Sequence, residues 1–63
     1  MLNKANLSTI QKSLQLITEG ALSDEIMSLG EKSTDPNQAR LVTASVQVQG
    51  AINLIGKVLE TLE

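Results

Sequence analysis

The sequence predicts an all-α fold: an antiparallel hairpin of two helices, spanning about residues 6–29 and 36–62. Three observations support it. Apolar residues recur at helical spacing in both halves of the chain, a glycine ends the first periodic segment, and an Asp-Pro pair opens the second. With 63 residues, the chain is expected to form a single domain over 1–63.

The first helix is predicted from apolar residues at alternating steps of three and four, a stripe typical of helix packing. They are Leu7, Ile10, Leu14, Ile17 and Ala21. The stripe then moves by one place, to Leu22, Ile26 and Leu29. We attribute this shift to the drift of a straight helix against a seven-residue repeat. Gly20, which lies at the shift, is either a tolerated glycine or the site of a kink or close helix contact.

The ends of the helices are predicted from capping residues. Asn3 or Asn6 is expected to cap the first helix, and Gly30 to end it in a left-handed conformation. Asp35 is expected to cap the second helix, with Pro36 at its first position. Gln38 is expected to bond back to the cap, and Glu31-Lys32 to be a solvated loop pair.

The second helix carries two overlapping apolar stripes. One comprises Leu41, Val48, Ile52, Ile55, Leu59 and Leu62, with Ser45 in the missing place; the other comprises Ala44, Val48, Ala51, Ile55, Val58 and Leu62. Together they are wider than one neighbouring helix can cover. Because the loop is short, the helices lie antiparallel, and the surplus face is expected to bind another chain. The predicted partner interface is Ala44, Val48, Ala51, Leu54, Ile55, Val58 and Leu62.

Two glycines on this helix, Gly50 and Gly56, form no phosphate-binding loop. They either let a neighbour pack close or are simply tolerated. A chain this short has marginal stability on its own, so another chain is its expected support.

The composition argues against catalysis, cofactors and metal sites. The chain has no Cys and no His, so it lacks zinc-thiolate ligands and the commonest acid–base catalyst. Its serines therefore have no His to activate them, and Asp24 and Glu25 are adjacent and point in different directions on a helix. We expect a non-catalytic protein.

Charge and hydropathy limit the possible partners further. The net charge is −2, and the basic residues Lys4, Lys12, Lys32, Arg40 and Lys57 form no evident patch, so nucleic acid is not an expected partner. No apolar segment is long enough to insert across a membrane, and the first twelve residues do not resemble a secretory signal. We expect a cytoplasmic protein.

The corner and second helix resemble the small helical-hairpin co-chaperones of type III secretion needle subunits. The likeness lies in Gln38 after the polar turn, in "VQGAINLIGKVLETLE" from Val48 to Glu63, and in Glu19–Leu22. Several members carry Tyr or Trp where this chain has Ala39–Val42. The resemblance implies a cytoplasmic hairpin that pairs with a helical-repeat chaperone and keeps the needle subunit soluble before export.

The needle subunit family is a second resemblance, carried by the polar, proline-ended turn "KSTDP". It implies a self-assembling structural subunit. From the residues alone, self-assembly could give a filament or a closed four-helix bundle dimer. A small regulator that fills a helical groove in another protein is equally compatible with the pattern.

Overall fold

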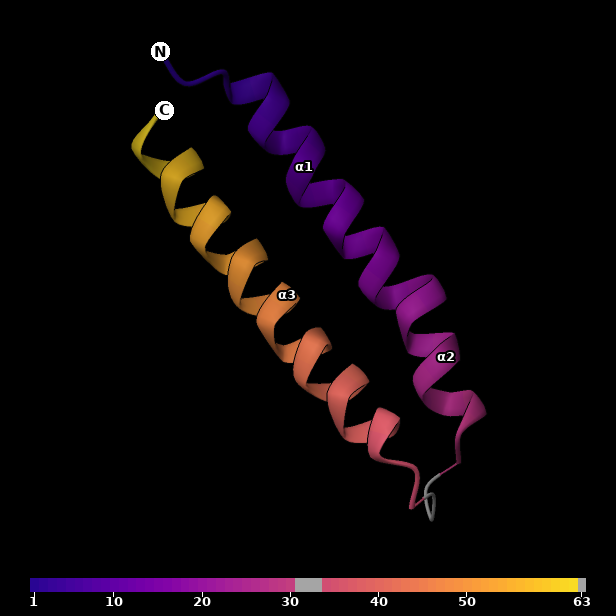
Figure 1. Cartoon of the computed structure of the whole chain (residues 1–63). Coiled ribbons are helices and arrows are strands. Elements are labelled where there is room, and N and C mark those ends of the chain that lie inside the picture. Colours follow the sequence, from indigo (N-terminus) through magenta and orange to yellow (C-terminus); the bar gives the residue numbers. More distant parts are fainter. Residues whose placement is uncertain (31–33, 63) are drawn as a thin grey trace.

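The computed structural model describes residues 1–30 and 34–62. Two long helical segments run antiparallel and side by side (Figure 1). The first segment consists of α1 (Lys4–Ile17), a π-helical turn η1 (Thr18–Leu22) and α2 (Ser23–Ser28); the second is α3 (Pro36–Thr61). The prediction of an all-α helical hairpin is confirmed.

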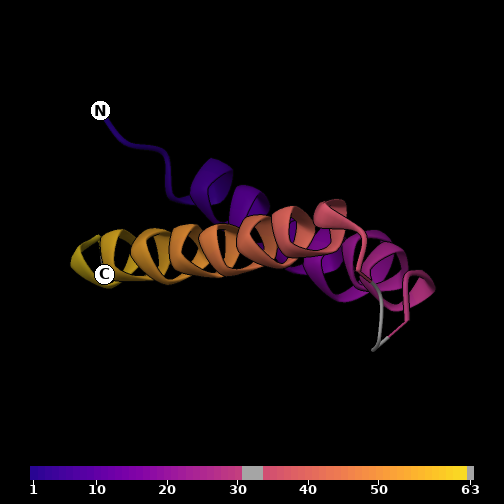
Figure 2. The same cartoon turned by 60° about the horizontal axis from the view of Figure 1, so that its bottom comes forward.

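The hairpin is a thin rod. Its principal extents are 45 × 15 × 14 Å, and its radius of gyration is 14.4 Å, against about 11 Å for a compact domain of this length. The two segments cross at a shallow angle, and in the described residues no third layer covers either face (Figure 2). Among the described segments, each therefore has one neighbour, and much of its circumference remains outside the hairpin.

The first helix begins earlier than predicted. The side-chain oxygen of Asn3 accepts a hydrogen bond from the backbone N–H of Asn6, 3.0 Å away, so Asn3 rather than Asn6 is the cap. The helix consequently starts at Lys4, two residues before the expected boundary. At the other end, α3 stops at Thr61 and Leu62 forms its C-cap.

A π-helical turn, not helix drift, explains the shift of the apolar stripe. In a π turn the backbone bonds to the fifth residue rather than the fourth, so the helix accommodates one extra residue. The turn spans Thr18–Leu22 and contains Gly20, where an added Cβ would meet nothing within 4 Å. The close helix contact expected at Gly20 is absent within this hairpin, and the shift is a local change of helix type at that glycine.

The corner follows the predicted capping pattern with one correction. Gly30 has φ of 79°, and the Asp35 carboxylate accepts a hydrogen bond from the N–H of Asn37 at 2.9 Å. Pro36 opens the helix as predicted. Gln38 does not bond back to the cap: its side-chain amide donates to the carbonyl of Gly30, at 2.8 Å. The expected pair Glu31-Lys32 lies outside the described residues.

The face that α1 turns toward α3 differs from the predicted apolar stripe. Leu7 and Leu14 lie inward and half-buried, as expected. Ile10 and Ile17, however, are 46% and 53% exposed. The positions that face α3 are instead occupied by two polar residues, Gln11 and Thr18, which are both half-buried. The first helix is therefore rotated so that part of its apolar stripe lies outside the hairpin.

Candidate protein-binding face

A shared seven-residue repeat describes both long helices. We label its positions a to g. Position a holds Leu7 and Leu14 of α1, and Leu41, Val48, Ile55 and Leu62 of the second segment. Position d holds Ile10, Ile17, Ala44, Ala51 and Val58; position e holds Gln11, Thr18, Ser45, Ile52 and Leu59. Around the helix axis, e and d lie on opposite sides of a.

The two helices of the hairpin contact each other through positions a and e. Ile52, at e, is 3% exposed and is the one buried residue in the described part of the chain. Leu41, Ser45 and Leu59 are half-buried on the same side. The inward face of α3 is therefore centred between a and e, and α1 matches it with Leu14, Gln11 and Thr18.

A polar contact joins the two helices at this rotation of α1. The side-chain amide of Gln11 donates a hydrogen bond to the backbone carbonyl of Ile52, at 3.3 Å. A Cβ at Gly56 would lie 3.1 Å from the same amide nitrogen. Gly56 therefore leaves room for Gln11 to reach the helix backbone, which answers the question raised by the sequence. Gly50 has no such neighbour within 4 Å in this hairpin.

Thr18 is also accommodated at an inward place. Its hydroxyl donates a hydrogen bond to the carbonyl of Leu14 at 2.8 Å, one turn earlier in the same helix. In the described residues, no buried side-chain nitrogen or oxygen lacks a hydrogen-bond partner. The a/e contact is thus less apolar than the predicted stripe, but its polar atoms are satisfied.

The d positions of both helices lie on one face of the hairpin. Each d position is displaced from the inward direction in the same rotational sense, and on two antiparallel right-handed helices this places them on the same side. We call this the d face and define it by Ile10, Ile17, Ala44, Ala51 and Val58, with Leu54 at its edge. Leu54 occupies position g and is 64% exposed.

The residues predicted to contact a partner fall into three groups. Ala44, Ala51 and Val58 lie on the d face and are half-buried at the side of the hairpin. Val48 and Ile55 occupy position a, between the d face and α1, and are also half-buried. The two remaining residues, Leu54 and Leu62, are 64% and 37% exposed.

Sequence reasoning missed Ile10 and Ile17 as members of this face, because it assumed that the most apolar side of the first helix must face the second. Two features could have shown otherwise. Gln11 has a long amide side chain beside this stripe, and Gly56 supplies a matching gap on the other helix. A pair of this kind can set helix rotation at the expense of apolar burial.

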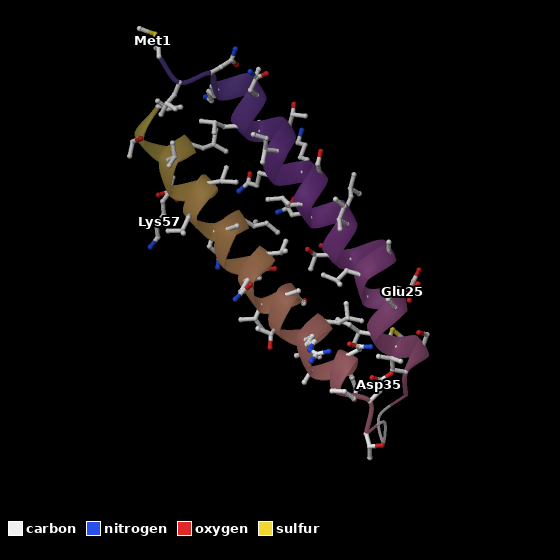
Figure 3. All side chains as sticks on the ribbon, in the orientation of Figure 1. Met1, Glu25, Asp35 and Lys57 are labelled. Carbon is white, nitrogen blue, oxygen red and sulfur yellow. The ribbon has the colours of Figure 1, made fainter. Side chains whose placement is uncertain are left out.

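None of the residues that define the d face is charged. Lys4, Lys12, Lys57 and Glu60 fall at positions c, e and f, away from it. In Figure 3, Lys57 and Glu25 point outward from the pair of helices, and neither is one of the residues that define the d face. Arg40 is the charged residue at position g, beside a shallow hollow at the corner end of α3. The hollow is lined by Ala39, Arg40, Thr43, Ala44 and Gln47.

In 1–30 and 34–62, no group of three or more acidic side chains could hold a metal ion. Nor does any helix there combine the length and apolarity needed to cross a membrane. Comparison with protein families, curated proteins and solved structures finds no match for the chain.

Proposed function

We propose that this chain is a non-catalytic protein-binding module that uses the d face to hold another polypeptide. The observation that carries the proposal is the position of Ile10, Ile17 and Leu54: large apolar side chains that the hairpin leaves about half exposed or more. Burying a Leu or Ile side chain fully contributes about 1.5–3 kcal/mol, so a partner that covers several of them gains substantial affinity.

The resemblance to type III secretion co-chaperones gives this proposal its specific form. In that form, the hairpin pairs with a helical-repeat chaperone in the cytoplasm, and together they keep the needle subunit soluble before export. The d face supports it in one respect: an apolar helical surface with little charge is suited to packing against other helices.

A second candidate function is self-assembly as a structural subunit. It is favoured by the presence of d-face residues on both helices, because one hairpin then offers a complete half of a helical bundle. A filament and a closed dimer differ in symmetry: a head-to-tail contact continues, and a two-fold contact closes.

The test of the binding function uses a charge placed at the exposed edge of the d face. Leu54→Asp would bury an unpaired carboxylate in the complex, which is strongly unfavourable. The matched control is Val46→Asp, because Val46 is 67% exposed and lies at position f, away from the d face. Each tagged chain is purified from its native cell, and the bound proteins are identified by mass spectrometry.

The proposal expects a helical-repeat protein, together with a helical secreted subunit, to co-purify with the parent chain and Val46→Asp but not with Leu54→Asp. Equal recovery of these proteins with all three chains would refute the use of the d face. Recovery of no partner with the parent chain would refute the co-chaperone function. Ile55 is a poorer site for the charge, because it also lies against the first helix.

A further inference from the structure

We propose that two copies of this chain associate through their d faces into a closed, two-fold four-helix bundle. The inference rests on the proposed function in one respect: both assign the binding surface to the d face. In this inference the partner on that face is a second copy of the chain. It has four supports: the direction of the apolar stripes, the exposed area, the order of large and small residues along the face, and its low charge.

The first support is the direction of the apolar stripes. From 100° per residue, the stripe of α1, centred between Leu14 and Ile10, lies about 50° from the face that α1 turns to α3. The stripe of α3 is turned by about 40°, toward the same side of the hairpin. In a square four-helix bundle, each helix points its stripe at the bundle axis, about 45° from either neighbour. Both helices of the hairpin have this orientation.

The second support is the exposed area. The chain has 4867 Å² of accessible surface, whereas the scaling of surface with mass gives about 3,900 Å² for a folded monomer of its mass. The excess is therefore close to the ~800 Å² that each partner loses in a standard interface. One copy of similar size and shape, laid along the rod, is enough to remove it.

The third support is the order of side chains along the d face. Because Gln11 lies level with Ile52 and Gly56, counting along the helices places Ile10 between the levels of Ala51 and Val58. The same count places Ile17 between the levels of Ala44 and Ala51. If the two-fold axis runs along the bundle, α1 of one copy faces α3 of the other at these levels. Ile17 then enters a gap between two alanines, and Ile10 enters a gap between an alanine and a valine.

The low charge of the d face removes a common obstacle to such a contact, because an unpaired charge in a dry interface is costly. Arg40, at position g, lies at the edge, where water remains accessible. In the dimer, the interface buries Ile10, Ile17, Ala51 and Val58. Together with the position-a residues of both copies, they form one apolar core.

The first experiment measures the mass of the purified chain alone by sedimentation equilibrium, from about 1 to 200 μM. We expect a closed monomer–dimer equilibrium that reaches twice 6.7 kDa. Ile17→Asp should raise the dimer dissociation constant at least 100-fold, because it buries an unpaired charge. Leu16→Asp is the control: Leu16 is 72% exposed and lies at position c, so its dimer should remain. A monomer at 200 μM, or an open series of larger species, would overturn the closed dimer.

The second experiment uses milder substitutions and fixes the arrangement. The chain has no Cys, so an Ile17→Cys chain and an Ala51→Cys chain can be mixed and oxidised without competing thiols. In the proposed bundle these positions are neighbours across the interface, whereas the two copies of Ala51 lie diagonally opposite. We expect the mixed disulfide to exceed either homodimer at least fivefold. Predominance of the Ala51→Cys homodimer would instead place α3 against α3 and overturn the arrangement.

The two proposals fail separately. The mass and disulfide measurements use the purified chain without other proteins, so a monomeric result removes the bundle and leaves the binding function untouched. Conversely, a dimer that binds no helical-repeat protein in the native cell supports the bundle and refutes the co-chaperone function.

Discussion

The side-chain amide of Gln11 hydrogen-bonds to the main-chain carbonyl of Ile52 on the opposite helix, over the position where Gly56 lacks a side chain. This carbonyl already accepts the N–H four residues later, as in any α-helix. The absence of Cβ at that later residue exposes its second lone pair. The glycine thus gives the Gln11 side chain access to the backbone of the opposite helix.

Alanine at Gly56 should stabilise the hairpin less than alanine at Gly50. Both changes improve helix propensity by up to about 1 kcal/mol. At Gly56, however, the new Cβ lies 3.1 Å from the Gln11 amide and should displace its hydrogen bond, which is worth about 1 kcal/mol. Thermal unfolding of both variants at one fixed concentration measures the difference.

The Gln11 contact can be isolated in a double-mutant cycle. Gln11→Ala is expected to destabilise the parent by about 1 kcal/mol and to have little effect in the Gly56→Ala background. Equal effects in both backgrounds would show that Gln11 and Gly56 act independently.

The cap at Asp35 should contribute measurably to α3. Its carboxylate accepts the N–H of Asn37 at 2.9 Å, so Asp35→Ala is expected to lose about 1 kcal/mol of unfolding free energy. Asp35→Asn keeps an acceptor oxygen and should retain most of the stability. Urea titrations followed by circular dichroism compare the three chains, and an alanine variant as stable as the parent would contradict the cap.

Alanine at Gly30 should be unfavourable even though nothing crowds the position. An added Cβ there would meet no atom within 4 Å, but the backbone has φ of 79°. A residue with a Cβ in this conformation loses about 1–2 kcal/mol. Gly50→Ala serves as the control, because its site is equally open and Gly30 is the one described residue with a positive φ. A stabilised Gly30→Ala variant would argue against this corner geometry.

Deleting Gly20 should rotate α1 relative to α2. Without the extra residue the π turn becomes an ordinary α-helical turn, and the stripe of Leu22 and Ile26 then continues into Ile17 and Ile10. We expect methyl nuclear Overhauser contacts from Ile10 and Ile17 to α3 to increase, and self-association to weaken at least tenfold.

Gly20→Ala is the control for this deletion, because it keeps the chain length and should keep the turn. Unchanged methyl contacts after the deletion would show that the π turn does not set the rotation of α1.

Most of the fold was predictable because its signals are local. Gly30, Asp35 and Pro36 act within a few residues of themselves, and helical periodicity is visible in the chain alone. The rotation of α1 was not predictable from periodicity. We attribute it to a contact between residues 41 positions apart, Gln11 and Ile52, and to an inserted residue in a turn whose composition differs little from an α-helix.

The candidate face was predictable to a lesser extent. The apolar width of α3 is visible in the amino-acid sequence and indicates Ala44, Ala51, Leu54 and Val58, since this stripe is wider than one neighbour needs. The same periodicity places Ile10 and Ile17 in the interior instead. An apolar residue at such a position can either pack against α3 or lie on the d face. We infer that the polar residue beside it decides between the two.

The π turn divides the first helical segment into two parts that pack differently. Past the turn, Leu22, Ile26 and Leu29 all lie toward α3 and close the corner end of the rod. Before it, α1 divides its apolar side chains between α3 and the open side of the molecule. A one-residue insertion or deletion in this turn would therefore change the length of the rod that can contact another chain. The corner that joins the helices would stay as it is.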